Sequence, residues 1–574
     1  MFVPKSLIVI ATVALYSDLA LAAADPAPEG YRTVSIGVTR TGRPMTATIP
    51  AGDSYNAKRP RVLIVYGLNG DDGAPIRIGE KFKNFEAAWV LDNPDAVGTK
   101  KTGTNFSGGN PALGYPPKAG YYDSPTDPES RYLWRWIGMY APDLVVNVEF
   151  GKGQSWRVAG GSLPQLDQLL RQLPEARKLP IYDGLPQVLV HAPPCDVGLV
   201  PAVQLATDNL ASLHALDEAL GKLMLAPSPA RLEIQNRLAR SPQLIAEQLL
   251  ESYGKQLPAV QYIPALALVG RLRHERNARG DKVAVSPVVL KAAMPYLDGK
   301  KPALDAKANG STFSGHLIFA ELAEHPSIAE RDRRLCVELI KAVGDRAFDK
   351  SGKPLEVMPS HNEMSDAVFM NGPILAYAGK LTGDAKYFEA SVRNMKFMQK
   401  LCLRDDGIYR HSPLDEAAWG RGNGFPALGL AWTLDALPES FAGRSEVATA
   451  LEKHLRALLP HQDHTGMWHQ VIDKPESYAE FTATAMIAYA MARGVREGRL
   501  DAKTFDPPIR RAWEGLKSRI AADGTLVDVC TGTGKQPSLR AYYDRPAILG
   551  RDDRGGAMAL MIVTEMELYM TSGK

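Results

Sequence analysis

Residues 419–425 (WGRGNGF) place an indole, a guanidinium, an amide and a phenyl ring on a backbone with three glycines. Glycine is a poor helix former, whereas residues 426–434 have a continuous apolar face typical of a helix. We therefore expect a loop at a helix N-terminus, where free backbone N–H groups can meet an anion. An aromatic ring beside a bidentate guanidinium and an amide suits a sugar that carries a carboxylate. The alternative is a packed turn with Trp419 and Phe425 in the core.

Other segments carry side chains of the same kinds next to helical patterns. They contribute Asp366, His361, His411, Trp468, Gln470 and Tyr543. A carboxyl group, histidines, an arginine and aromatic rings that line one pocket would suit a carbohydrate. Asp366 has a second interpretation as a helix N-cap, because it precedes the apolar residues 367–370.

Helical periodicity dominates the chain after residue 260. The apolar pattern predicts helices at 261–275, 285–296, 314–324, 329–343, 366–382, 385–402, 424–436, 445–459, 478–497, 507–521 and 555–571. Turn pairs end in Gly352, Gly407, Gly466 and Gly524, which are 55, 59 and 58 residues apart. This period fits one helical hairpin plus a short extended excursion per repeat. Six such hairpins in a ring would form an (α/α)6 toroid, with the connecting loops at one mouth.

The first half of the chain has a different pattern. Buried-strand runs at 62–67, 143–148 and 186–192 alternate with a helix near 130–139 and with loops rich in glycine and proline at 97–128. This alternation predicts an α/β domain with a mostly parallel sheet. Residues 201–224 and 228–253 are expected to be two helices that join the halves. The predicted units are a signal peptide (1–22), the α/β domain (26–200), a helical bridge (201–260) and an all-α domain (261–574).

Composition narrows the partners. A net charge of +3 gives no electrostatic footprint for nucleic acid. Four scattered cysteines show no metal-ligand spacing and are expected to be buried thiols. A basic start, an apolar run and Ala20-Leu21-Ala22 fit a secretory signal, so we expect a periplasmic or secreted protein without a membrane partner after cleavage. A retained anchor is the alternative. The oligomeric state is left open.

Six segments of the second half, taken in order, resemble the unsaturated rhamnogalacturonyl hydrolases of glycoside hydrolase family 105 and the related glucuronyl hydrolases of family 88. The segments are 366–370 (DAVFM), 407–411 (GIYRH), 419–425, 466–470 (GMWHQ), 478–486 (YAEFTATAM) and 494–498 (GVREG). The resemblance implies an (α/α)6 toroid that needs no cofactor and hydrates the enol ether of a 4,5-unsaturated uronic acid.

The resemblance also implies roles for individual residues. Asp366 would be the catalytic general acid and base. Arg421 and His411 would grip the uronate carboxylate or orient water. Stacking on the sugar would come from Trp419, Trp468 and Phe425, and hydroxyl contacts from Asn423 or Gln470. His361 and Tyr543 complete the predicted substrate-binding set.

One family feature is missing. A second aspartate usually starts an earlier inner helix, but residues 309–314 (NGSTFS) contain no carboxylate. Asp305 is near in sequence, and Glu363, His361 or Glu480 are the other candidates for that role. Hydrolysis of saturated uronides on the same fold, or carbohydrate binding by decayed catalytic centres, are therefore alternative functions.

Four weaker segments of the first half resemble the M14 zinc carboxypeptidases, namely 41–44, 63–72, 92–96 and 142–149. Where that family has zinc ligands this chain has Asn69, Asp72 and Glu149, which suit harder cations. We therefore expect a degenerate domain without catalytic zinc. Calcium on Asp72 and Glu149, a ligand in the cleft, or an active metallopeptidase are the alternatives.

Overall fold

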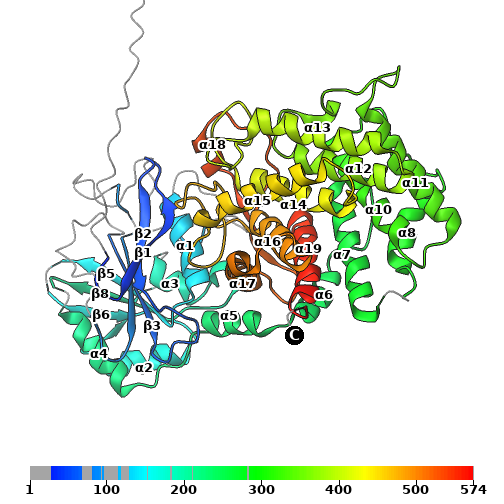
Figure 1. The fold of residues 1–574 in the computed structure, drawn as a ribbon. Helices are drawn as coiled ribbons and strands as arrows, with labels where there is room; N and C mark the ends of the chain where they lie inside the picture. The colour runs from blue at the N-terminus through cyan, green and yellow to red at the C-terminus, as the bar shows by residue number, and fades with distance from the viewer. Residues whose placement is uncertain are drawn as a thin grey trace, which may run out of the picture.

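The computed structural model describes residues 27–67, 81–91, 93–95, 114–117, 128–151, 153–180, 184–209, 211–280 and 283–572. Two units lie side by side, a sheet domain and a larger helical domain (Figure 1). Within the described residues, no helix is both long and apolar enough to cross a membrane. All four cysteines are buried free thiols, as predicted.

The sheet domain contains one mixed sheet with the strand order β1-β2-β4-β3-β5-β8-β6-β7. The strands are β1 Tyr31–Val38, β2 Pro44–Pro50, β3 Arg61–Tyr66, β4 Glu86–Leu91, β5 Leu144–Phe150, β6 Ser155–Val158, β7 Arg177–Lys178 and β8 Ala202–Thr207. The central strands β4, β3, β5 and β8 are parallel, and β2 and β6 flank them in the opposite direction. Both faces of β3 are buried, which explains its unbroken apolar run.

Helices cover this sheet, and two predictions fail among them. The helices are α1 Pro128–Tyr140, α2 Pro164–Gln172, α3 Leu185–Leu189 and α4 Ser212–Lys222. The strand predicted at 186–192 is wrong because this stretch forms α3 and a turn. The helix predicted over 201–224 begins instead as strand β8, which pairs with β5. The sheet domain therefore extends beyond residue 200. A short apolar run fits a buried strand and a buried helix equally well.

The predicted bridge helix at 228–253 is two helices, α5 Pro229–Ala239 and α6 Pro242–Leu250. Pro242 cannot continue the preceding helix because it lacks an N–H group. It occupies the first turn of α6, and Ser241 Oγ accepts a hydrogen bond from the Leu244 N–H group. The break lets α5 contact both the sheet domain, through Arg231 and Asp143, and α17 of the helical domain, while α6 packs on the helical domain.

The helical domain is a closed ring. The inner helices are α7 Tyr262–Arg279, the broken pair α9 Gly310–Gly315 and α10 Leu317–Glu324, α12 Ala367–Thr382, α14 Gly420–Ala436, α16 Phe481–Arg496 and α19 Asp553–Tyr569. Each packs against the next, and α19 packs back against α7. The outer helices are α8 Pro287–Leu297, α11 Glu330–Gly344, α13 Ala385–Cys402, α15 Arg444–Leu458, α17 Ala502–Ser518 and α6. The alternation of inner and outer helices is the arrangement expected from the sequence.

The predicted turn repeat is confirmed in detail. All four repeat glycines have positive φ, from 82° at Gly352 to 89° at Gly466. At each turn the glycine N–H group bonds the carbonyl three residues earlier, and that earlier residue bonds a carbonyl four residues ahead. Glycine suits this left-handed conformation because it has no Cβ atom.

The loop predicted at 419–425 is wrong, because α14 already begins at Gly420. The glycines serve close packing rather than flexibility. A Cβ atom at Gly420 would lie 2.4 Å from the His469 carbonyl oxygen, and one at Gly424 would lie 2.9 Å from Met486 Sδ. Tertiary packing therefore overrides the low helix propensity of glycine.

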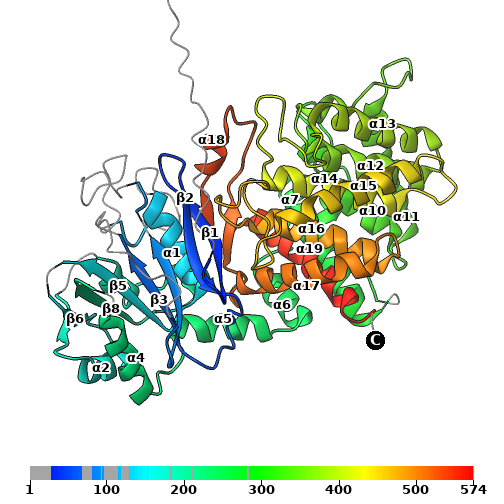
Figure 2. The same cartoon turned by 60° about the vertical axis from the view of Figure 1, so that its left-hand side comes forward.

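The two domains lie side by side in Figure 2. They share an apolar core and a buried ion pair. Asp528 lies on strand β9 (Leu526–Cys530). It forms ion pairs with Arg135 Nη2 of α1 at 2.6 Å and with Arg519 Nε at 2.9 Å. Its partner strand β10 (Ala547–Gly550) and the short helix α18 (Leu539–Tyr543) lie in the same region. The loops of the helical domain that line this interface are thereby fixed to the sheet domain.

Candidate active site

The inner helices of the ring begin at one mouth, and the residues that precede them differ in what their side chains do. Asn309, Glu480 and Asp552 each accept hydrogen bonds from the first N–H groups of their helix. Asp366 stands in the same position before α12, but its side chain makes no capping hydrogen bond. The interpretation of Asp366 as a helix cap is therefore wrong, and the Asp366 carboxylate is not used to bond the start of α12.

The Asp366 carboxylate instead faces His411. Asp366 Oδ2 lies 3.2 Å from His411 Nε2, and its side chain is 12% exposed while His411 is fully buried. His411 Nδ1 lies 2.8 Å from the hydroxyl oxygen of Tyr542. Burial raises the pKa of Tyr542 to about 12, so this hydroxyl keeps its proton and can donate it to Nδ1. The remaining imidazole proton then sits on Nε2, the nitrogen that lies 3.2 Å from Asp366 Oδ2.

The backbone before Asp366 is fixed to both neighbours. The Ser365 N–H group donates to the His411 carbonyl (2.9 Å), and Ser365 Oγ donates to the Gly422 carbonyl (2.7 Å). Asn362 and Glu363, at the preceding bend, both have left-handed φ angles of 50° and 55°. Non-glycine residues adopt this conformation only where surrounding contacts impose it. The bend and the serine together set the position of the carboxylate.

Arg421 is buried and bound to protein rather than free for a ligand. Its guanidinium donates to the carbonyls of Cys530 (2.8 Å) and Thr531 (2.7 Å). It also lies over the Trp419 ring. Burial alone would lower the pKa of Arg421, but nearby Cys530, Tyr262, Glu480 and Asp366 raise it. The positive charge therefore persists close to the mouth without an exposed face.

The two predicted amide ligands also bond the protein backbone. Asn423 Oδ1 accepts from the Tyr409 N–H group at 2.7 Å, and its Nδ2 donates to the carbonyls of Tyr409 and Trp419. Gln470 Nε2 donates to the Tyr542 carbonyl at 3.3 Å. Both amides are fully buried. They hold the segments that carry His411 and Tyr542.

The predicted stacking residues belong to the core as well. Phe425 stacks on Phe369 with ring centres 5.6 Å apart. Trp468 is fully buried, and its Nε1 donates to the Leu458 carbonyl. Trp419 is buried against the His411 ring, with centres 4.4 Å apart. Direct stacking of a sugar on these rings stays a prediction without a supporting contact.

Tyr543 and His361 lie away from the carboxylate. The Tyr543 hydroxyl donates to Glu476 Oε1 at 2.6 Å and the ring belongs to the interdomain core. Its neighbour Tyr542 is the tyrosine that reaches His411. His361 is half-buried against Phe397, and its Nδ1 accepts from the Glu363 N–H group. Desolvation is the main reason that the pKa of His361 is lowered.

No second carboxylate replaces the missing family aspartate among the described residues nearby. Asn309 caps α9, and Asp305 is an exposed turn residue that accepts from the Lys307 N–H group. Glu480 is fully buried and accepts hydrogen bonds from Ala483 and Cys530. Glu363 is exposed and paired with Lys535 at 2.9 Å. Asp366 is therefore the carboxylate of this mouth that is neither capping nor paired with a cationic residue.

Two further residues of the mouth, Tyr262 and Arg554, were not predicted from the sequence. Tyr262, the first residue of α7, has a partly exposed ring that packs edge-on against Phe369 and Phe425. Burial raises its pKa, and the charges of Arg421, Asp366, Arg554 and Asp552 act on the same phenol. Arg554 lies in the first turn of α19, with its side chain 26% exposed. The predicted start of the helix at 261 was the available signal for Tyr262.

The weak metal candidates do not form a described site. Asp72 and Asn69 lie outside the described residues, and Glu149 lies near the end of β5, partly exposed. No group of three potential metal ligands occurs in the described parts of the chain. Nothing here extends the resemblance to the zinc carboxypeptidases beyond a prediction.

Part of the chain is similar to a known family of glycoside hydrolases. Residues 344–570 match the model of Glycosyl Hydrolase Family 88. An unsaturated 3S-rhamnoglycuronyl hydrolase of Formosa agariphila is 28% identical over 183 residues, which are 28% of this chain and 48% of that protein. The unsaturated rhamnogalacturonyl hydrolase YesR of Bacillus subtilis is 27% identical over 191 residues, which cover 32% of this chain and 53% of that protein.

A solved structure, a family 105 glycoside hydrolase of C. acetobutylicum, has 22% identity and a TM-score of 0.49, covering 57% of this chain and 99% of that one. The chain spans about half the length of the two relatives named above. The matched region contains Asp366, His411 and Tyr542. Residues 344–570 of the chain are therefore similar to glycoside hydrolase family 88.

Proposed function

We propose that the helical domain is a glycoside hydrolase that removes a terminal 4,5-unsaturated uronic acid from oligosaccharides released by a polysaccharide lyase. The observation that carries this proposal is the Asp366 carboxylate, which does not cap α12 and lies 3.2 Å from His411 Nε2 at the mouth of the ring. The relatives' names support the substrate class. We also propose that the protein is exported through the signal-like residues 1–22, which lie outside the described structure.

The proposed reaction needs one positioned acid. Protonated Asp366 donates its proton to C4 of the enol ether, which leaves a cationic centre at C5. Water adds at C5, and the Asp366 carboxylate accepts a proton from that water. The resulting hemiketal opens and releases the next sugar. His411 Nε2 lies 3.2 Å from Asp366 Oδ2, so a proton on Nε2 would stabilise the carboxylate electrostatically through both steps.

The uronate carboxylate requires a cation, and Arg421 has no free edge to offer. Arg554 is the better candidate because its side chain is partly exposed and its protein contacts are long, 3.7 Å to Asp552 and 3.4 Å to the Cys530 carbonyl. It also lies in the electrostatic surroundings of Tyr262 together with Asp366. A guanidinium binds a carboxylate through two parallel hydrogen bonds. We therefore assign Arg554 to the carboxylate and Tyr262 to the floor of the sugar site.

Hydrolysis of a saturated uronide is less well supported. Displacement at C1 uses two carboxyl groups on opposite sides of the bond. Among the described residues at this mouth, Glu480 is used as a cap and Glu363 is paired with Lys535. Addition of water to an enol ether avoids this requirement.

Asp366→Asn provides the test. On lyase-generated oligosaccharides, the wild type should remove the ultraviolet absorbance of the enol ether, and the variant should be slower by about 10²–10⁴-fold with its oligosaccharide affinity retained. Asp305→Asn is the matched control, because Asp305 is exposed and only caps a turn. Unchanged absorbance with the wild type on every lyase product would reject the proposal and favour a binding protein.

A further inference from the structure

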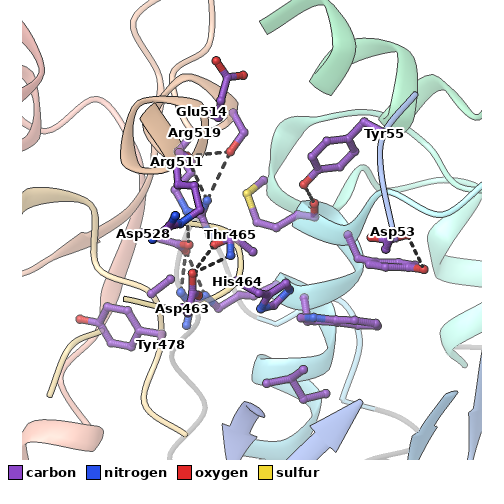
Figure 3. Close-up of a pocket in the computed structure, with 18 of the residues that line it drawn as sticks. Asp53, Tyr55, Asp463, His464, Thr465, Tyr478, Arg511, Glu514, Arg519 and Asp528 are labelled. Carbon is purple, nitrogen blue, oxygen red and sulfur yellow. Dashed lines mark hydrogen bonds and ion pairs between the residues drawn. The ribbon is translucent and has the colours of Figure 1, made fainter. Parts of the chain in front are cut away.

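A cavity lies between the two domains. It has a volume of about 490 Å³, within the range of small-ligand sites. Its wall combines β1, the segment 53–56 and α1 of the sheet domain with the turn at 463–465, residues 477–479 and α17 of the helical domain. His464 extends into the space between Asp463 and Tyr478 on one side and Asp53 and Tyr55 on the other (Figure 3). Asp366, His411 and Tyr262 are not part of this wall.

Three of the four acidic residues of the wall have an arginine or lysine partner, and the fourth, Asp463, lies beside a histidine. Asp53 Oδ2 pairs with Arg61 Nη2 at 2.7 Å, and Asp528 pairs with Arg135 and Arg519. Asp463 Oδ2 lies 3.1 Å from His469 Nε2, and Glu514 pairs with Lys517. The negative charges of Asp53, Asp528 and Glu514 are therefore balanced by these arginine and lysine neighbours.

Two arginines of the wall have no carboxylate partner among the described residues. The Arg32 side chain has no hydrogen-bond or ion-pair partner among the described residues, and its Nε atom is buried. Arg511 donates only to the neutral amide of Gln462, at 2.7 Å. His464 lines the same space, and desolvation is the main cause that lowers its pKa. Two guanidinium groups without a carboxylate leave the cavity short of negative charge.

An aromatic ring lies in the same wall. Trp136 of α1 is half-buried and stacks on Tyr140, with ring centres 4.6 Å apart and planes 12° apart. Arg61 in turn lies over Tyr140, at 4.0 Å from the ring centre. Stacking on Tyr140 thus fixes the orientation of the indole ring, as sugar stacking requires. Unpaired guanidinium groups and a fixed aromatic plate together suit a saccharide with a carboxylate.

We propose that the interdomain cavity is a second binding site for an acidic saccharide, in which Arg32 and Arg511 bind the carboxylate and Trp136 stacks on the sugar ring. The ligand would bridge the sheet domain and the helical domain. This site is independent of turnover at Asp366. Its role would be to hold a more distant part of an acidic chain, or a released acidic sugar, on the same protein.

The test uses the full chain carrying Asp366→Asn, so that no turnover disturbs the measurement, and the probe is tri-galacturonate. Calorimetry should show saturable binding that Arg32→Gln or Arg511→Gln weakens about tenfold, the effect expected for loss of a charge-assisted hydrogen bond. Trp136→Phe should weaken it less. Arg157→Gln is the matched control, since Arg157 is an exposed arginine of strand β6 outside the cavity wall.

Hydrogen exchange locates the bound ligand. Tri-galacturonate should protect peptides covering 460–470 and 53–56, and Arg32→Gln should abolish that protection. The proposal is overturned if protection is confined to 531–546, beside the Asp366 mouth, or if neutral galactotriose binds equally well. It is also overturned if inorganic phosphate competes with equal affinity and Trp136→Phe has no effect, which would indicate a simple anion site. Arg32→Gln should leave turnover of an unsaturated disaccharide by the Asp366-containing protein unchanged, so failure of either proposal is seen separately.

Discussion

Replacing Tyr542 by phenylalanine tests how the site positions His411. The substitution keeps the ring and removes the one hydroxyl that lies 2.8 Å from His411 Nδ1. Without that donor, the proton of the fully buried imidazole is no longer fixed on Nε2. In the other tautomer a lone pair on Nε2 would face Asp366 Oδ2 at 3.2 Å, which disfavours the arrangement needed for catalysis.

The magnitude follows from the lost hydrogen bond. Leaving a buried polar group without its partner costs about 1–3 kcal/mol. If that cost falls on the transition state, kcat should drop by about 5- to 150-fold at roughly 1.4 kcal/mol per tenfold. KM should change little, because Tyr542 is buried behind His411 rather than exposed at the mouth.

The neighbouring residue supplies the control. Tyr543→Phe removes a hydroxyl that bonds Glu476 at 2.6 Å on the side of the sheet domain. Both variants lose one buried hydroxyl, so both should lose comparable thermal stability, and only Tyr542→Phe should lose kcat. Kinetics on an unsaturated disaccharide, with melting temperatures measured beside them, separate the two effects. Equal kcat values for the two variants would refute the role assigned to Tyr542.

Two further predictions concern stability. Gly420→Ala should lower the melting temperature by several degrees, because overpacking costs about 1–3 kcal/mol and the new Cβ atom would lie 2.4 Å from the His469 carbonyl oxygen; Gly534→Ala, with no atom within 4 Å, should have little effect, and equal melting temperatures would show that α14 can shift. Burial lowers the pKa of His316 to about 4, so between pH 6.5 and 4 the unfolded chain binds a proton that the folded protein does not. Stability should therefore fall as the pH drops through this window, by about 3 kcal/mol from this residue, and urea unfolding of His316→Leu should show a correspondingly smaller loss; an identical pH dependence would contradict the assignment.

Much of the helical domain could be predicted from the sequence because its signals are long and repeated. The apolar stripes of α13 and α15 place those helices within one residue of their observed ends. The repeat glycines mark turns because their left-handed conformation excludes most other residues. Short signals failed where two structures satisfy the same residues, as at α3 and β8.

The site could be predicted only in part, for a related reason. Asp366 and His411 were identified by residue type and motif, and the structure brings them together. The choice between Tyr542 and Tyr543 depends on which way each side chain points, which adjacent positions in a loop do not reveal. The glycines of residues 419–425 indicated a loop because glycine has a low helix propensity. In the structure this segment is helical, and neighbouring elements pack so closely against the glycine positions that a Cβ atom would not fit there.

The hydrogen bonds of Arg421 and Asn423 bear on how the proposed sugar specificity could be changed by mutation. Because Arg421 ties α14 to the Cys530 and Thr531 carbonyls, its replacement would loosen the framework before it altered recognition. The side chains with freedom to vary are those at the rim, namely Glu363, Lys535 and Arg554. A library randomised at the rim, with 419–425 left intact, should therefore yield altered preference among folded proteins, whereas one randomised at 419–425 should yield mostly unfolded chains.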